Sequence, residues 1–230
     1  MEASTTGGSP DRRWMILVGF AVVAAVVVGA ILIGRSSGDD GGSKTAGAEG
    51  CEQVPEPKPK QVSFSKPKQT VKKGEEVSAR IETSCGDFTI ALDSKRAPKT
   101  VNSFVFLSEE GFYDGLSFHR IVPGFVIQGG DPLGNGTGGP GYSVDEKPPA
   151  NLAYTKGVVA MAKSSAEPPG RSGSQFYVVT GADAGLPPEY ALVGKVSEGM
   201  DVVERIGKLG TPSEKPKQPV IIEHAVIERP

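Results

Sequence analysis

The sequence of 230 residues predicts a mainly β fold: a closed eight-stranded antiparallel barrel capped by two α-helices, preceded by one transmembrane helix and a flexible linker. Two observations predict the barrel. Apolar residues gather in short stretches that suit strands, and glycine-rich and proline-rich loops separate these stretches. Glycine supplies 31 of the 230 residues, against a usual share of about 7%. A third observation, one long apolar run near the start, predicts the membrane helix.

The apolar run covers residues 14–33, which contain no charged side chain. A helix of that length spans about 30 Å, the thickness of the hydrocarbon layer of a bilayer. A cleaved signal peptide is the alternative, but its apolar region has about 7–15 residues and its cleavage site follows directly. Here the nearest matching pattern, Ala46-Gly47-Ala48, lies well beyond the run. The sequence therefore favours a retained anchor.

The positive charges around this helix predict its orientation. Arg12 and Arg13 precede it, whereas Arg35 alone follows closely and is succeeded by two aspartates. Because cytoplasmic flanks carry the excess of basic residues, the N-terminal tail, residues 1–13, is expected in the cytoplasm. The chain is thus expected to be a single-pass membrane protein whose folded domain lies outside the cytoplasm.

Residues 34–75 are expected to form a linker. Its first part is rich in glycine and serine, which is typical of a flexible coil, and residues 55–60 alternate proline with charged residues, which favours a stiffer extended spacer. Cys51 lies in this linker and Cys85 in a turn of the next domain. Two free thiols are the alternative to a disulfide, but an extracytoplasmic location permits the bridge, which would add about 3–4 kcal/mol of stability. We expect the bridge.

The folded domain is expected over residues 76–230. Apolar alternation predicts a hairpin from strands 77–81 and 88–92, and Pro98 begins a helix that ends at Gly111. A second helix is expected over residues 200–209. The remaining strands are expected at 118–122, 125–128, 157–162, 174–180, 191–196 and 221–227.

Composition excludes several function classes. The 25 basic and 27 acidic residues nearly balance, which argues against a nucleic-acid partner. Two histidines and two cysteines leave little for a metal site, so no metal and no cofactor is predicted. The run 134–139 formally matches a dinucleotide-binding fingerprint, but Pro140 follows it where a helix would have to start.

Several sequence blocks together resemble the cyclophilin-type peptidyl-prolyl isomerases, in order and in spacing, over about residues 77–228. They are FHRIVPGFVIQGGDP at 118–132, NGTGG at 135–139, GVVAMA at 157–162, SGSQFYV at 172–178 and LVGKVSEGMDVV at 192–203. The arrangement with a membrane anchor is similar to bacterial, especially actinobacterial, members. The resemblance implies an isomerase that accelerates rotation about X–Pro bonds during folding of exported or membrane proteins. The alternative is a proline-peptide-binding or chaperone module with little turnover.

The resemblance also assigns site residues. Arg120 matches the catalytic arginine, which stabilises the twisted amide, and Phe125 and Gln128 complete the catalytic set. Gln175 matches a group that orients the substrate. The wall of the proline pocket is expected from Phe125, Val126, Tyr177, Leu186 and Tyr190, and the rim, which contacts the peptide before the proline, from Gly136, Ala162, Lys163 and Ser164. His119 is expected to be a buried hydrogen-bonding residue.

Four positions depart from the commonest family pattern. Val126 replaces a methionine, Tyr190 a histidine and Lys163 an asparagine, and Gly185 stands where cyclosporin-sensitive members have a tryptophan. We therefore expect weak cyclosporin binding. The expected partners are proline-containing polypeptides and, through the single N-terminal helix, a membrane; a monomer is the default.

Overall fold

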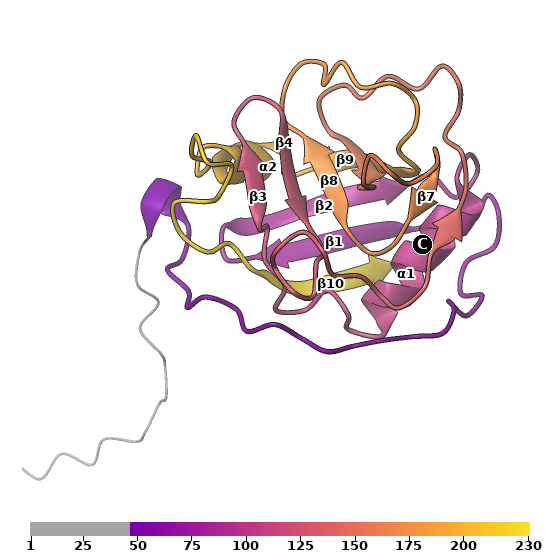
Figure 1. Ribbon diagram of the computed structural model, residues 1–230, viewed down its shortest axis with the longest axis horizontal. Helices are drawn as coiled ribbons and strands as arrows, with labels where there is room; N and C mark the ends of the chain where they lie inside the picture. Colours follow the sequence, from indigo (N-terminus) through magenta and orange to yellow (C-terminus); the bar gives the residue numbers. More distant parts are fainter. Residues whose placement is uncertain (1–46) are drawn as a thin grey trace, which may run out of the picture. The chain divides into compact units, whose positions relative to one another are not determined.

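The structure is a computed structural model that describes residues 47–230. An eight-stranded antiparallel sheet curls around the core in the order β10-β1-β2-β9-β6-β8-β4-β3 (Figure 1). Its strands are β1 (Ser78–Thr83), β2 (Gly86–Leu92), β3 (Arg120–Val122), β4 (Val126–Gly129), β6 (Val158–Met161), β8 (Phe176–Val179), β9 (Leu192–Glu198) and β10 (Ile222–Glu228). Two short strands, β5 (Val144–Asp145) and β7 (Arg171–Ser172), pair with each other.

Two helices pack on the sheet, as the sequence predicts. Helix α1 (Pro98–Glu109) starts with proline in its first turn and packs against β9 and β10. Helix α2 (Met200–Gly207) packs against β2, β3 and β4. A short 3₁₀ turn, η1 (Ala48–Gly50), precedes the domain.

Large aromatic side chains fill the space inside the curled sheet. Phe104 of α1 lies edge-on to Phe176 of β8, with ring centroids 5.5 Å apart, and Tyr113 and Phe118 contact the same Phe176 ring. All four are fully buried. Edge-to-face packing of this kind adds to the gain from burial, so the cluster fixes α1 against the strands that carry the site.

The expectation of a closed barrel is not confirmed. The sheet ends at β3 and β10, and among the described residues these two strands do not pair along their length. One isolated bridge, between Ser117 and Ile221, links the segments that lead into them. Strand β3 is short because the turn at Pro123 ends it, and its Ile121 N–H donates instead to the carbonyl oxygen of Glu214, at 2.7 Å. The sheet is therefore a curled half-barrel.

The expectation of a flexible linker up to residue 75 must be revised for residues 51–75, which we call the belt. The belt runs along the folded domain (Figure 1). Its Lys60 and Phe64 N–H groups donate to the carbonyl oxygens of Pro132 and Pro140, both at 2.8 Å. The Phe64 ring lies edge-on to Phe106 of α1 at 5.2 Å. Apolar residues spaced along the proline-rich segment thus give it a packed face.

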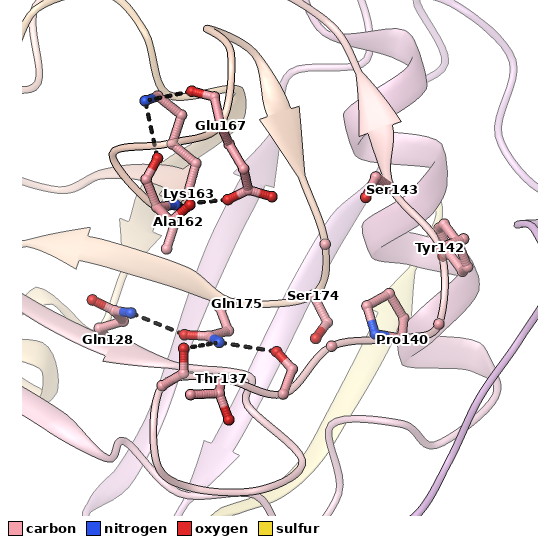
Figure 2. A pocket seen from close by; sticks show the side chains of 16 residues that line it. Gln128, Thr137, Pro140, Tyr142, Ser143, Ala162, Lys163, Glu167, Ser174 and Gln175 are labelled. Atoms are coloured by element: carbon pink, nitrogen blue, oxygen red, sulfur yellow. Dashed lines mark hydrogen bonds between the residues drawn. The ribbon is translucent and has the colours of Figure 1, made fainter.

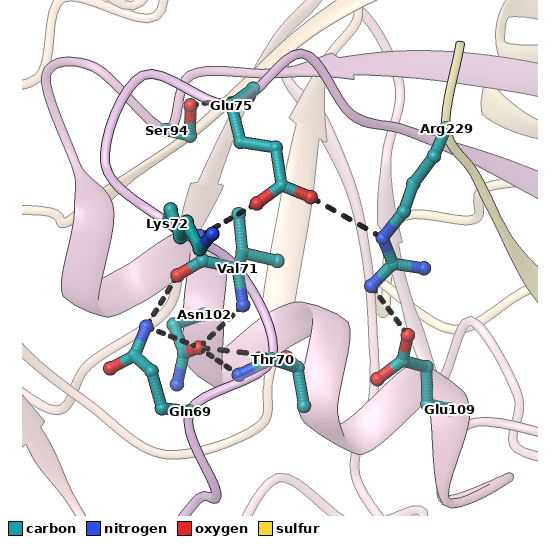
Figure 3. A network of polar contacts seen from close by, with 9 residues as sticks. All are labelled: Gln69, Thr70, Val71, Lys72, Glu75, Ser94, Asn102, Glu109 and Arg229. Atoms are coloured by element: carbon teal, nitrogen blue, oxygen red, sulfur yellow. Dashed lines mark hydrogen bonds and ion pairs between the residues drawn. The ribbon is translucent and has the colours of Figure 1, made fainter.

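Asn102 of α1 holds the far end of the belt (Figure 3). Its side-chain oxygen accepts the N–H groups of Thr70 at 2.8 Å and Val71 at 3.1 Å, and its amide group donates to the Lys68 carbonyl at 2.8 Å. Val71 is only 2% exposed. One buried amide therefore satisfies three backbone groups of a segment that has no secondary structure of its own.

A disulfide joins Cys51, at the start of the belt, to Cys85 in the β1–β2 turn. Next to it, the Glu52 N–H donates to the carbonyl oxygen of Ser84 at 2.6 Å. The belt is thus tied at both ends.

The predicted tail 1–13, membrane helix 14–33 and first part of the linker lie outside the described residues. Within residues 47–230, no helix is both long enough and apolar enough to span a membrane.

Candidate active site

A short hairpin places the predicted catalytic residues. Strands β3 and β4 are joined through Gly124, whose φ of 70° suits a residue without a β-carbon. The register pairs Arg120 with Gln128 and, on the other side, Gln128 with Tyr177 of β8. Because paired residues on adjacent strands project to the same face, these side chains form one row across three strands.

A chain of hydrogen bonds runs from Arg120 through Gln128 to Gln175 and on to the next loop; we call these three residues the Arg120 row. Arg120 Nη1 donates to Gln128 Oε1 at 3.2 Å, and Gln128 Nε2 donates to Gln175 Oε1 at 3.0 Å. Gln175 Nε2 in turn donates to the carbonyl oxygens of Gly136 and Gly138, at 3.0 and 2.9 Å. Each amide accepts on one side and donates on the other, so the row fixes the orientation of both glutamines and of the guanidinium.

Glu214 is a further residue at this site, and the sequence blocks do not reveal it. Its Oε2 accepts Arg120 Nε at 2.7 Å. It belongs to the loop before β10, far along the chain from Arg120, and no local pattern marks it. A guanidinium carries five N–H donors, so Arg120 keeps donors beyond those used by Glu214 and Gln128. Its side chain is 34% exposed, which leaves it accessible to a substrate.

A groove of about 700 Å³ opens beside this row (Figure 2). The structure brings the predicted rim residues together around it. Its lining includes Gln128, Gly136, Ala162, Lys163, Ser164 and Gln175, and it also includes Tyr142, Ser143, Glu167 and Ser174, which the sequence does not single out.

Asp131 shapes one wall of the groove. This carboxylate is 1% exposed and accepts the N–H groups of Leu133 and Asn135, at 2.8 and 2.9 Å, as well as that of Gly136. A buried carboxylate is tolerated here because several backbone donors compensate its charge. It holds residues 133–136 in the turn that presents the Gly136 carbonyl to Gln175.

Three tyrosines pack together, and one of them, Tyr177, is paired with Gln128 on the adjacent strand. The ring of Tyr190 lies edge-on to Tyr177 at 5.7 Å and to Tyr154 at 5.9 Å. Tyr154 Oη both donates to the Tyr190 carbonyl and accepts the Tyr190 N–H, and burial raises the pKa of Tyr154 to about 12. Burial also raises the pKa of Tyr177, whose hydroxyl makes no hydrogen bond within residues 47–230. Both phenols are therefore neutral at physiological pH.

The remaining predicted pocket residues pack against the core and do not line the groove. Val126 is buried, whereas Phe125 and Leu186 are partly buried against the core. The Phe125 carbonyl accepts the Thr180 N–H at 2.9 Å, which fixes the end of the hairpin to β8. The structure therefore places the predicted residues in two groups, a polar groove and an apolar region with tyrosines, which meet where Lys163 stands over the Tyr190 ring.

His119 is largely buried, as expected, next to the backbone of Ser117. Burial lowers the pKa of His119, although the Asp131 charge and the Ser117 backbone partly oppose this effect. Within residues 47–230, no three His, Cys, Asp or Glu side chains lie close enough together to form a metal site.

Comparison with known proteins places these features in a family. The family described as cyclophilin type peptidyl-prolyl cis-trans isomerase matches residues 78–227. Peptidyl-prolyl cis-trans isomerase B of Streptomyces anulatus is 38% identical over 174 residues, which cover 67% of this chain and 98% of that protein. Peptidyl-prolyl cis-trans isomerase A of Mycobacterium tuberculosis is 38% identical over 169 residues, 65% of this chain and 91% of that protein.

A solved structure agrees with these relatives. The crystal structure of a Cryptosporidium parvum cyclophilin-type isomerase in the presence of the dipeptide Ala-Pro has a TM-score of 0.62 and 34% identity. The match covers 66% of this chain and 99% of that one. The family match over residues 78–227 spans the curled sheet and its two helices. This chain belongs to the cyclophilin-type peptidyl-prolyl cis–trans isomerases.

Proposed function

We propose that this chain isomerises X–Pro bonds in exported or membrane proteins outside the cytoplasm, held there by the apolar segment 14–33. The observation that carries the catalytic part is the hydrogen-bonded row from Arg120 through Gln128 to Gln175. Gln128 and Gln175 of this row line the groove, and Tyr177 of the tyrosine cluster is paired with Gln128 on the adjacent strand. Twenty uncharged residues preceded by Arg12 and Arg13 support the location.

The chemistry requires no nucleophile. Rotation about a peptide bond meets a barrier of about 18–20 kcal/mol, because twisting removes the amide resonance. In the twisted state the prolyl nitrogen regains a lone pair and becomes a hydrogen-bond acceptor. A guanidinium donor aimed at that nitrogen stabilises the twisted amide more than the planar one, and so accelerates the reaction. Arg120 has donors to spare for this contact.

The surrounding residues position the reacting bond. Phe125, Val126, Tyr177, Leu186 and Tyr190 supply apolar surface for the proline ring, whose burial is favourable by about 25 cal/mol per Å². Gln175 and Gln128 hold the guanidinium and can contact the peptide backbone. Binding of the proline ring in this way orients the X–Pro bond at Arg120.

The decisive experiment is an exchange-NMR isomerisation assay on the chain with Arg120→Ala. Loss of the guanidinium should lower kcat/KM by about 100- to 1,000-fold, as removal of one preorganised donor does in other active sites. Arg96→Ala is the matched control, because Arg96 is exposed, pairs with Asp93 and does not line the groove. If the Arg120→Ala variant turned over as fast as the unchanged chain, the assigned role of Arg120 would be wrong.

The same assay separates an enzyme from a binding module. A module that only captures proline-containing segments would bind the peptides without raising the exchange rate.

Weak cyclosporin binding is a further expectation, since Gly185 offers no side chain to the drug. Isothermal calorimetry with cyclosporin measures this directly.

The location has its own test. In cells that express the full chain, the cell wall and any outer membrane are first permeabilised and the cytoplasmic membrane is left intact. Externally added protease should then degrade the folded domain, while residues 1–13 remain protected. Protection of the whole chain would contradict the proposed orientation and would leave the isomerase assignment untouched.

A further inference from the structure

The groove beside the Arg120 row contains two charged residues, Lys163 and Glu167. They belong to one loop, residues 163–170, which we call the rim loop. Which of the two charges a bound peptide meets depends on how each is already compensated. Their contacts differ sharply.

The Lys163 ammonium is compensated within the protein. Its side chain is 4% exposed, and Nζ donates to the carbonyl oxygens of Ser164 and Glu167, at 3.3 and 3.2 Å. The Glu189 carboxylate lies 3.3 Å away, and Nζ stands 5.4 Å from the centre of the Tyr190 ring. A buried ammonium with these four partners stabilises the rim loop and offers little charge to a ligand.

The Glu167 carboxylate is compensated far less. One oxygen accepts the Ser164 N–H at 2.7 Å, and no side chain forms an ion pair with it among the described residues. The nearby basic residue Arg171 makes two hydrogen bonds to Asp145, at 3.0 and 3.1 Å; its charge interacts with Glu167 at a distance, and it does not line the groove. Figure 2 shows the carboxylate extending from the rim loop into the groove, away from the Lys163 ammonium. Among the described residues, the groove therefore contains one carboxylate that no side-chain ion pair neutralises.

We propose that Glu167 makes this groove a subsite for a basic side chain, so that the chain prefers substrates with lysine or arginine shortly before the proline. The inference rests on the proposed isomerase function. The residue before a proline is confined to extended backbone, and side chains two positions apart in an extended chain face the same way. When the proline ring enters its pocket, the side chain two residues earlier therefore also faces the protein, and the groove receives it.

The test uses acetylated peptides Ala-Z-Ala-Pro-Phe amide, with lysine, norleucine or glutamate at Z. Norleucine matches the lysine stem without its charge. We expect kcat/KM for the lysine peptide to exceed that for norleucine by about threefold to fivefold, the scale of a partly exposed ion pair, and the glutamate peptide to be the poorest substrate. The difference should shrink in 1 M salt, where the Debye length is about 3 Å.

Glu167→Gln tests the residue itself. Glutamine keeps an acceptor for the Ser164 N–H, so the rim loop should keep its conformation. The ratio of kcat/KM for the lysine peptide to that for the norleucine peptide should fall to about 1. Glu198→Gln is the control, because Glu198 is exposed on β9 and does not line the groove; it should keep the full preference. Equal turnover of the lysine and norleucine peptides by the unchanged chain, or a preference that survives Glu167→Gln, overturns the proposal.

Peptide affinities measured by fluorescence polarisation distinguish this failure from failure of the proposed function. Lysine-selective binding without any rate enhancement would support the subsite and contradict the isomerase. Rate enhancement that is equal for all three peptides would support the isomerase and contradict the subsite.

Discussion

Arg120 shares its guanidinium between a neutral partner and a charged one. Gln128 accepts from Nη1 at 3.2 Å and Glu214 from Nε at 2.7 Å. The carboxylate is half exposed, so its contribution to folding stability is small, about 0–1 kcal/mol. In the proposed mechanism, Glu214 orients the guanidinium plane, and Arg120 contacts the substrate with the donors that Glu214 leaves free.

Replacement of Gln128 by alanine tests how far this orientation matters. The change removes an acceptor from Arg120 and a donor from Gln175, so the row breaks at its centre. We expect kcat/KM to fall by about tenfold to 100-fold, since small misplacements of a catalytic group are costly. Isomerisation assays should show the loss in kcat more than in KM. Gln61→Ala, at an exposed belt position, should have no effect; equal activity of both variants would remove Gln128 from the site.

The two histidines should titrate on opposite sides of the usual imidazole pKa of about 6.5. Burial lowers the pKa of His119, whereas the hydrogen bond to Asp114 raises the pKa of exposed His224. NMR titration of the imidazole signals resolves the two residues, and each is the control for the other. Coincident titration would contradict the burial of His119.

These shifts have opposite consequences for stability. Between the lowered pKa of folded His119 and about 6.5, the unfolded chain binds more protons than the folded one, so stability falls as pH drops through that window. The contribution of His224 is present below about 6.5 and is lost as pH rises through its raised pKa. Acidification therefore weakens the fold through His119 only below about pH 6.5, whereas acidification through the raised pKa of His224 strengthens it.

At the scale of elements, the belt supports the groove from outside. Its Phe64 N–H donates to the carbonyl of Pro140, a residue that lines the groove, and its Lys60 N–H donates to Pro132 in the preceding turn. Glu75 and Glu109 share Arg229 near the end of the chain, which fixes the belt's last residues to α1 (Figure 3). The belt thus connects helix α1 to the loop that forms the groove wall.

Asn102→Ala should detach the belt from α1. It leaves the Thr70 and buried Val71 N–H groups and the Lys68 carbonyl without partners. We expect a loss of about 1–3 kcal/mol in the free energy of unfolding, measured by urea denaturation. Asn102→Asp keeps the acceptor for both N–H groups and should cost less. If the two variants were equally stable, the accepted bonds would not hold the belt.

Sequence patterns predict those helices and strands whose own residues carry a clear pattern, such as apolar alternation or a proline at the first turn. The alternation at Ala79, Ile81, Phe88 and Ile90 predicts the β1–β2 hairpin, because each strand buries one face. Pro98 likewise marks the start of α1. Strands β5 and β7 escape prediction because two residues carry no periodicity. The belt escapes because its few apolar residues are embedded among prolines and lysines, a composition typical of linkers.

The site divides in the same way. Arg120, Phe125 and Gln128 fall within one continuous block, so their proximity follows from a single hairpin. Glu214 contacts the site from a distant loop, and only the folded chain brings it there. Glu167 follows the predicted rim residue Ser164 closely in the chain, but no pattern marks its carboxylate as part of the groove. The burial of Lys163 is also invisible in the sequence, where a lysine reads as a surface charge.

For the molecule as a whole, the disulfide decides how firmly the belt belongs to the fold. Cys51 and Cys85 are 34 positions apart, and closing a loop of that length restricts the unfolded chain enough to contribute about 4 kcal/mol. The bond encloses the entire belt, so its loss should weaken the whole domain and free the belt's first residues together.

Replacement of both cysteines by serine should therefore lower the free energy of unfolding by about 3–4 kcal/mol, measured by urea denaturation of residues 47–230. Reductant should destabilise the unchanged protein equally and leave the double variant unaffected. Activity at 25 °C should stay within about twofold, because neither cysteine lines the groove and Asn102 still holds the belt's other end. A double variant of unchanged stability would show that packing alone fixes the belt.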